Sequence, residues 1–213
     1  MKIKPNSNKE KIIHNKNITD INYSFFKRLF DIILSLLGIM ITIPIMISIA
    51  IAIKLDSPGS IIFKQTRLGK GAKKFSIYKF RSMIQGAEEK TGAIWAKEND
   101  CRVTNVGKFL RRTRLDELPQ LFNILKGEMT LVGPRPERPI LAQKFEDQYP
   151  GFEDRLVVKP GLTGLAQVKG GYNLSARQKL RLDMIYIKER NLFLDLWIVF
   201  KTIVVMIKGE GAR

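Results

Sequence analysis

The longest apolar segment of the chain lies near its N-terminal end. From Ile32 to Ile53 the residues run IILSLLGIMITIPIMISIAIAI without a charge. A straight helix of this length reaches about 33 Å, enough to cross a hydrocarbon core about 30 Å thick. The pattern therefore predicts a membrane helix. A secretory signal peptide is the alternative, but the segment is longer than a usual hydrophobic signal region and no small-residue cleavage site follows it.

Basic residues flank this segment on both sides, with Lys27 and Arg28 before it and Lys54 after it. Because lysine and arginine mark cytoplasmic flanks, both ends are expected on the cytoplasmic side. A re-entrant helix satisfies this rule, and Pro44, in the middle of the segment, is the expected break. An ordinary span with a tolerated proline is the alternative. Asp31 is costly in lipid and is expected to pair with Arg28 or Lys27 near the surface.

Turn residues divide the rest of the chain into short elements. The cluster at 56–59 is expected to end the membrane helix, and two strands are expected at IIFKQTRLG and KKFSIYKFRSM, joined at 69–71. The Gly-rich segment at 157–171 is expected to be a loop with a short strand. Helices are predicted at 106–127 with a break before Pro119, at about 140–148, and at 175–207 with a break near Asn191.

The last helical segment, LFLDLWIVFKTIVVMIK, is apolar but carries Asp195 and Lys201. It is expected to lie in the membrane interface with Phe193 and Trp197 at headgroup depth, a second span being the alternative. The chain is thus expected to be an α+β protein. A basic flexible tail (1–22) precedes a re-entrant membrane helix hairpin (23–55), and a small, mostly helical cytoplasmic domain (56–213) carries a short β-hairpin and interfacial amphipathic helices.

The charge balance of the chain requires an anionic partner. Among 213 residues, 37 are Lys or Arg and 20 are Asp or Glu, which leaves a net charge of +17. Nucleic acid, an anionic membrane and phosphorylated substrates all fit this excess. Cys101 and His14 are the single residues of their types, so an internal disulfide and a Cys/His zinc site are excluded, and thiol or histidine catalysis does not fit.

The adjacent pair Asp116-Glu117 is the strongest candidate for chemistry. It stands just before Pro119, so both carboxylates are expected near the positive end of the following helix. There they can converge on a hard cation such as Mg2+, which commonly bridges carboxylates and substrate phosphates. An aspartate can also act as a nucleophile toward phosphorus.

Arginines surround this pair in the sequence. Arg111, Arg112 and Arg114 precede it, and Arg135 and Arg138 follow it in the segment GPRPERP. Guanidinium groups match phosphate oxygens in bidentate fashion and stabilise charge on a transferring phosphoryl group. The prolines stiffen the backbone that carries the last two arginines. A basic surface that faces anionic lipid is the alternative for much of the excess charge.

Several motifs, in order, resemble the bacterial sugar transferase family, the monotopic polyprenyl-phosphate phosphoglycosyltransferases. The resemblance covers about residues 24–213 and leaves only the tail unexplained. The motifs are KRLFDIILSLLGIMITIPIMI, IFKQTRLG, YKFRSM, VGKFLRRTRLDELPQLFNILKGEM, LVGPRPERP, PGLTGLAQV and the ending KTIVVMIKGEGAR.

This resemblance implies a two-step reaction in residues 56–213, which would be the catalytic domain. Asp116 would attack the β-phosphate of a UDP-sugar, release UMP and carry the phosphosugar, which polyprenyl phosphate (undecaprenyl phosphate) would then collect. Glu117, with Asp116, would hold Mg2+, with Mn2+ as an alternative ion. The residues expected to bind substrate phosphate groups are Lys79, Arg111, Arg135 and Arg138.

The resemblance also implies a location and partners. The chain would lie at the cytoplasmic face of the bacterial inner membrane, with both termini in the cytoplasm, and catalyse the first membrane step of exopolysaccharide, capsule or glycoconjugate synthesis. Its partners would be a UDP-sugar, polyprenyl phosphate and anionic lipid, without nucleic acid; a homodimer is left open. Members of the family often have Ser-Pro at the helix break, where this chain has Ile43-Pro44.

Two alternatives from other functional classes remain at this point. A membrane-anchored basic protein would bind anionic lipid or nucleic acid without catalysis, and its binding would fall steeply with salt. An inactive scaffold of the family is the other, although the intact Asp116-Glu117 pair argues against it. Glucose, galactose and N-acetylated amino sugars all remain open as the donor sugar.

Overall fold

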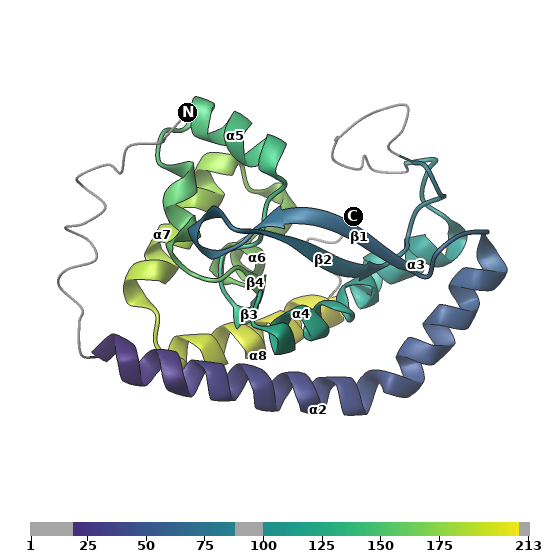
Figure 1. Cartoon of the computed structure of the whole chain (residues 1–213), viewed down its shortest axis with the longest axis horizontal. Coiled ribbons are helices and arrows are strands. Elements are labelled where there is room, and N and C mark those ends of the chain that lie inside the picture. Colours follow the sequence, from purple (N-terminus) through teal and green to yellow (C-terminus); the bar gives the residue numbers. More distant parts are fainter. Residues whose placement is uncertain (1–18, 88–99, 209–213) are drawn as a thin grey trace.

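The computed structural model describes residues 19–87 and 100–208. Most of the tail predicted at 1–22 lies outside these ranges. The described chain is mostly helical, with two small two-stranded sheets. The long helix α2 runs along one side of the molecule, and the other elements are gathered above it (Figure 1).

The predicted long apolar helix is confirmed as a single helix, α2 (Thr19–Asp56). It begins at Thr19 rather than at residue 23, and its residues 23–56 are long and apolar enough to cross a membrane. Pro44 lies inside it, and the ribbon bends in its second half (Figure 1). The residues on both sides of Pro44 stay helical, so the expected break is a bend in a continuous helix. A proline removes one backbone hydrogen bond, which permits such a bend.

One face of α2 packs on the rest of the protein and the opposite face is exposed. Ser35, Ile39 and Ile53 on the packed face are 0%, 9% and 2% exposed. The exposed face is apolar along the whole length of the helix, from Phe25 (67%) through Met40 (70%) to Leu55 (83%). Exposed apolar area of this extent marks a surface for lipid or for another protein.

Both ends of α2 are bound to the same domain. Near its start, Arg28 donates hydrogen bonds to the carbonyl oxygens of Ile124 (2.6 Å) and Leu125 (2.8 Å). At its end, the Asp56 carboxylate accepts a hydrogen bond from the Val106 amide (3.0 Å).

The end of α2 is also held from the β-hairpin by Arg81. Its guanidinium group, buried to 6% exposure, donates to the carbonyl oxygens of Ser57 (2.7 Å) and Pro58. These carbonyls follow the last turn of the helix, where unpaired acceptors and the helix dipole favour a cation. Arg81 therefore fixes where α2 ends.

The expected pairing of Asp31 with Arg28 or Lys27 is wrong. Asp31 accepts hydrogen bonds from the Thr130 hydroxyl (2.6 Å) and the Leu131 amide (3.0 Å), and Lys27 instead pairs with Asp195 (2.8 Å). The reason is that a buried amide and hydroxyl need an acceptor, and the carboxylate supplies one.

The predicted β-hairpin is confirmed. Strands β1 (Ile62–Leu68) and β2 (Lys74–Phe80) pair antiparallel, in a register that runs from Ile62 opposite Phe80 to Leu68 opposite Lys74. The connection contains the short 3-10 turn η1 (Lys70–Ala72). Gly71 there has a φ of 65°, a conformation that glycine adopts without steric cost.

A second sheet was not foreseen in full. Strand β3 (Thr130–Val132) pairs parallel with β4 (Gly161–Thr163), and the short helix α6 (Leu165–Lys169) follows within the segment expected to be a loop. A side chain at Gly161 would collide with the backbone of Gly133. Glycine at this position therefore lets two backbone segments approach each other.

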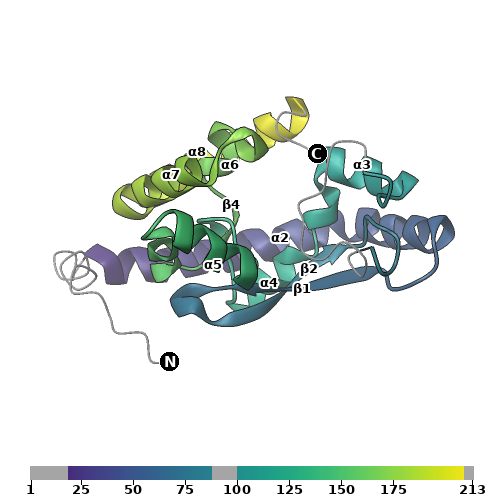
Figure 2. The same cartoon turned by 90° about the horizontal axis from the view of Figure 1, so that it is seen from above.

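The remaining helices follow the predicted order, and the predicted break near Asn191 is confirmed between α7 and α8. Their bounds are α3 (Asn105–Thr113), η2 (Leu115–Glu117), α4 (Gln120–Lys126), α5 (Pro139–Gln148), η3 (Phe152–Val157), η4 (Gly171–Asn173), α7 (Ala176–Glu189) and α8 (Leu192–Lys208). Figure 2 shows α7 and the β1–β2 hairpin on opposite sides of the domain.

Helix α8 combines a buried acid with an exposed apolar face. Asp195 is fully buried and accepts hydrogen bonds from Tyr23 (3.0 Å), Lys27 (2.8 Å) and Tyr186 (2.8 Å). The acid thereby joins α8 to the start of α2 and to α7. Phe193, 80% exposed, lies on the apolar face, as an interfacial helix requires. Among the described residues, only α2 has the length and composition of a membrane span.

Candidate active site

Helix α3 is held against the end of strand β2 by close backbone contact. The Thr104 amide donates to the Ser82 carbonyl oxygen (3.2 Å), and a side chain at Gly107 would collide with that same carbonyl group. Glycine is therefore required where α3 meets the backbone that follows β2. On the same helix, Arg111 donates from Nε to the Ser82 hydroxyl (2.9 Å).

A sharp turn at Arg114 carries the chain from α3 into the acidic pair. Arg114 has a φ of 57°, in the left-handed region that residues other than glycine seldom adopt. Such a conformation costs on the order of 1–3 kcal/mol and is concentrated at functional sites. The 3-10 turn η2 follows directly and contains Asp116, which is 8% exposed, and Glu117.

Asn123 fixes the distance between helix α4 and strand β2. Its amide nitrogen donates to the Ser76 carbonyl oxygen (2.8 Å), and its amide oxygen accepts from the Tyr78 amide (3.0 Å). The side chain thus forms the two hydrogen bonds that a neighbouring strand would form along this edge of β2. The result is that η2, just before α4, lies beside Lys79 of β2.

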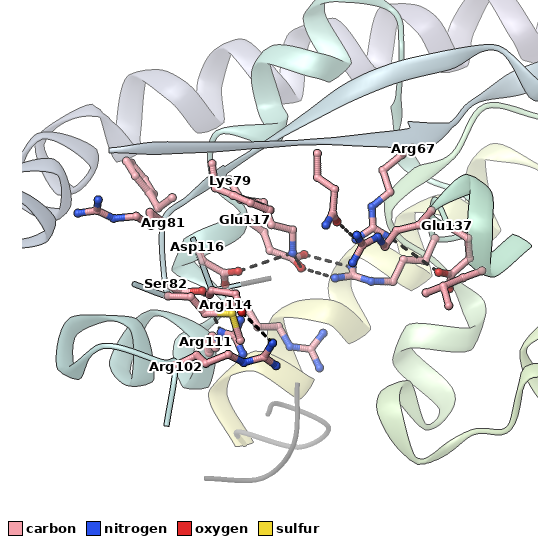
Figure 3. Close-up of a pocket in the computed structure, with 18 of the residues that line it drawn as sticks. Arg67, Lys79, Arg81, Ser82, Arg102, Arg111, Arg114, Asp116, Glu117 and Glu137 are labelled. Atoms are coloured by element: carbon pink, nitrogen blue, oxygen red, sulfur yellow. Dashed lines mark hydrogen bonds and ion pairs between the residues drawn. The ribbon is translucent and has the colours of Figure 1, made fainter. Parts of the chain in front are cut away.

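The two carboxylates converge on Lys79. The Lys79 ammonium lies 2.8 Å from Glu117 Oε1 and 3.6 Å from Asp116 Oδ2. The Arg135 guanidinium also binds Glu117, in bidentate fashion, with one nitrogen 3.3 Å from Oε2. Figure 3 shows Lys79 above both acids. Glu117 is thus fixed by two cations, whereas Asp116 has the looser contact.

The environment separates the proton affinities of the two acids. Burial raises the pKa of the Asp116 carboxyl, and the neighbouring charge of Glu117 adds to this effect against the opposing charge of Lys79. Burial acts on Glu117 as well, but the charges of Arg135 and Lys79 outweigh it and hold its pKa well below the usual range. Pairs of acids with separated pKa values are typical of catalytic sites.

The acids open onto a cavity of about 440 Å³ whose walls are rich in cations. A cavity of this size is in the range of small-molecule sites. Its cationic side chains greatly outnumber its acids, which suits a ligand with several negative charges. The basic residues that line it are Arg67, Lys79, Arg81, Arg102, Arg111, Arg114, Arg135, Arg138, Arg155 and Lys179.

The structure brings most of the residues proposed from the sequence to this cavity. The exception among the arginines is Arg112, which is exposed on α3 and does not line it. Pro44 lies in α2, away from the cavity lining, as a helix-bending residue. The residues in common between prediction and cavity are Lys79, Arg111, Arg114, Asp116, Glu117, Arg135 and Arg138.

Further residues of the cavity were not foreseen from the sequence. Arg155 and Asp183 are 4% and 1% exposed and form an ion pair at 3.1 Å. Gln167 from α6 lines the same cavity. Burial raises the pKa of Asp183 to about 6 in spite of Arg155. No local sequence signal distinguishes these residues from solvated helix positions, because their burial depends on how α6, α7 and η3 pack.

The acidic pair supplies carboxylate oxygens, the donor chemistry that a divalent cation such as Mg2+ prefers. Within residues 19–87 and 100–208 no group of three or more Asp, Glu, His or Cys side chains converges. Asp116 and Glu117 nevertheless both point at the Lys79 ammonium, so both can reach a single cationic centre. Mg2+ is usually held by one or two carboxylates together with water and substrate phosphates, so two protein ligands are sufficient.

Comparison with known proteins gives the chain a family. Residues 22–209 match the family model described as "Bacterial sugar transferase". The chain belongs to the bacterial sugar transferase family. The predicted family is thereby confirmed, and with it an enzyme class in place of a basic binding protein without catalysis.

Three relatives show what named members of this family do. The chain is 48% identical over 194 residues (90% of the chain, 46% of the relative) to the UDP-N-acetylgalactosamine-undecaprenyl-phosphate N-acetylgalactosaminephosphotransferase of Aeromonas hydrophila. It is 44% identical over 183 residues (84% and 39%) to the UDP-glucose:undecaprenyl-phosphate glucose-1-phosphate transferase of Klebsiella pneumoniae. It is 39% identical over 194 residues (87% and 97%) to the exopolysaccharide production protein PSS of Rhizobium leguminosarum bv. phaseoli.

These relatives differ in length. The chain spans less than half of the Aeromonas and Klebsiella proteins but nearly all of the Rhizobium protein. All the cavity residues discussed above lie within the part of the chain that matches the family.

Proposed function

We propose that the chain transfers a sugar-1-phosphate from a UDP-sugar to undecaprenyl phosphate and releases UMP, as the first membrane step of glycan synthesis. The observation that carries the proposal is the buried Asp116 beside a fixed Glu117 at the wall of a cation-lined cavity. The names of the relatives support the donor and acceptor classes.

Asp116 acts as the nucleophile in this proposal. Its carboxylate oxygen attacks the β-phosphorus, the bond from that phosphorus to the bridging oxygen breaks, and UMP leaves with the electron pair. An oxygen of undecaprenyl phosphate then attacks the same phosphorus and frees the carboxylate. The looser contact of Asp116 with Lys79 (3.6 Å) leaves it more available than Glu117.

The cations of the cavity bind and stabilise the phosphate groups. Lys79, Arg111 and Arg135 lie around the acids, where charge develops on the transferring phosphoryl group. Arg138, from the same segment as Arg135, also lines the cavity. Asp116 and Glu117 would hold Mg2+, which supplies a further positive charge for the phosphate oxygens. The positive charge of these groups also favours the ionised form of Asp116 that attack requires.

Release of UMP tests the reaction and its metal requirement. The donors are UDP-N-acetylgalactosamine, UDP-glucose and UDP-galactose, offered to protein in nanodiscs with undecaprenyl phosphate and Mg2+. We expect UMP from at least one donor, an almost complete loss of release with EDTA, and recovery when Mg2+ or Mn2+ is restored. Full activity in excess EDTA would contradict the metal proposal, and no UMP from any donor in folded protein would contradict the reaction.

We further propose that α2 is re-entrant, with both ends on the cytoplasmic face of the inner membrane. Arg28 near its start and Asp56 at its end bind the same domain, and a helix that crossed the bilayer would place one end on the far side. The apolar face of α2 and that of α8 supply the membrane contact.

Labelling of cysteines from outside intact cells tests this topology. Cys101 is exposed and reports the domain that follows α2; Asn8→Cys in a Cys101→Ser background reports the chain before it. We expect an impermeant maleimide to label neither cysteine in intact cells and both after permeabilisation. Labelling of position 8 alone in intact cells would show that α2 spans the membrane.

A further inference from the structure

One part of the cavity wall, formed by η3, α6 and α7, is polar but lies apart from the acidic pair in the sequence. It is made by Arg155, Gln167 and Asp183, which are 4%, 8% and 1% exposed. All three line the cavity. None of them has a role in the attack on phosphorus proposed above, so their burial at the wall of the substrate cavity requires a separate explanation.

Arg155 is fixed from several sides, and one of its nitrogens is unpaired among the described residues. Its guanidinium group pairs with Asp183 at 3.1 Å, donates to the Arg135 carbonyl oxygen and stacks on Phe152, 4.9 Å from the ring centre. Within the described parts of the chain, Nη1 of Arg155 has no hydrogen-bond partner. This wall is therefore joined directly to the backbone of Arg135, whose side chain binds Glu117.

Gln167 is the most unusual side chain of this wall. Neither its amide nitrogen nor its amide oxygen has a hydrogen-bond partner among residues 19–87 and 100–208. A side chain at Gly164 would lie 2.8 Å from the amide oxygen, so glycine there leaves room for the amide. An unpaired buried amide costs about 1–3 kcal/mol, and buried polar groups are almost always paired with protein, water or ligand.

The comparison with Gln120 shows why the cavity matters. Gln120 is fully buried and also lacks partners for both amide atoms among the described residues, but it does not line the cavity. Among the described residues, Gln167 alone combines an unpaired buried amide with a side chain that belongs to the cavity lining. A carboxamide offers one acceptor and two N–H donors without charge, so it matches a neutral group that has both a donor and an acceptor.

We propose that Gln167, in the cavity that Arg155 and Asp183 also line, is the subsite that recognises an uncharged donor–acceptor edge of the UDP-sugar. This chemistry occurs in the hydroxyl and acylamino groups of the sugar and in the imide edge of uracil. The inference rests on the proposed function and assigns the neutral part of that substrate to the α6 wall, whereas the arginines near Asp116 take its phosphates. A site built to hydrogen-bond a substrate discriminates strongly against analogues that lack the group.

The test replaces the amide with an apolar group of similar size. Gln167→Leu is compared with Gln143→Leu, a matched change at an exposed position of α5, both in an Asp116→Asn background that prevents turnover. Calorimetry measures binding of UMP and of UDP-N-acetylgalactosamine, UDP-glucose and UDP-galactose. We expect Gln167→Leu to weaken UDP-sugar binding by about 10- to 100-fold, with a Tm that is unchanged or higher because an unpaired buried amide is removed.

The same measurement shows whether Gln167 binds the sugar or the uracil of the UDP-sugar. Weaker binding of UDP-sugars with unchanged binding of UMP assigns the subsite to the sugar, and equal weakening of both assigns it to uracil. Equal affinities in Gln167→Leu and Gln143→Leu would overturn the inference, as would a lower Tm with unchanged affinity, which indicates a structural role. Binding does not depend on turnover. Release of UMP by Asp116→Asn would therefore exclude Asp116 as the nucleophile without affecting the inference about Gln167. Failure of the parent protein to bind all three UDP-sugars would overturn the proposed function together with this inference.

Discussion

Asp116→Asn is expected to lower the rate of UMP release by on the order of 10⁴-fold or more, as removal of a covalent nucleophile does in other enzymes. The substitution keeps the shape of the side chain and removes the attacking charge. When the parent protein is given a UDP-sugar donor but no undecaprenyl phosphate, intact-protein mass spectrometry should detect the mass of a phosphosugar adduct. The Asp116→Asn variant should have no such adduct.

The stability of this variant provides an independent check. Because burial raises the pKa of Asp116 in the folded state, the folded state favours the protonated acid. Its ionised form is therefore destabilising once the pH exceeds the folded pKa, and this cost is absent below the unfolded pKa. Asparagine carries no charge, so we expect a Tm at neutral pH equal to or above that of the parent. Asp147→Asn, at an exposed position of α5, is the matched control and should retain full activity. UMP release at the parental rate by folded Asp116→Asn would exclude Asp116 as the nucleophile.

Asp195→Ala is expected to have the largest effect on stability. The change leaves the largely buried Lys27 ammonium, whose side chain is 14% exposed, and the hydroxyl groups of Tyr23 and Tyr186 without their shared acceptor. Loss of one partner of a buried ion pair costs about 3–5 kcal/mol, which for a chain of this size corresponds to a fall in Tm of about 6 to 20 °C. Thermal unfolding in nanodiscs measures it.

Two further variants decide whether the ion pair is responsible. Asp147→Ala removes an exposed carboxylate and should leave the Tm unchanged. Lys27→Met combined with Asp195→Leu removes both charges and should recover part of the loss, because no charge is then buried alone. A Tm for Asp195→Ala that matches the control would mean that the junction of α2 and α8 contributes little to stability.

The parts of the fold that depend on local pattern could be predicted from the sequence. The apolar run gave α2, the turn at 69–71 gave the hairpin, and Gly127 ends α4 in a left-handed conformation with a φ of 81°. The parallel pair β3–β4 could not be predicted, because its strands have three residues each and their pairing joins distant segments. The partner of Asp31 was predicted wrongly for the same reason, since Thr130 lies 99 residues away.

The candidate site follows the same division. Asp116, Glu117 and the nearby arginines were identified because adjacent acids surrounded by cations form a local signal. Lys79 was identified through its motif alone. Asn123, Arg155 and Gln167 were missed, since a buried role for an amide or a guanidinium group becomes visible only when α4 meets β2 or when η3 and α6 form the cavity wall.

Three consecutive residues at the end of strand β2 and just after it link the acidic pair to helix α2. Lys79 reaches the acids and Arg81 holds the end of α2, and the one residue between them, Phe80, is buried against Ile49 and Ile53 of that helix. Any shift of the end of α2 is therefore passed on to Lys79. In the proposed reaction, a water-borne donor and a lipid-borne acceptor would meet at a depth set by one short stretch of backbone, which would act as a rigid spacer between the membrane and the nucleophile.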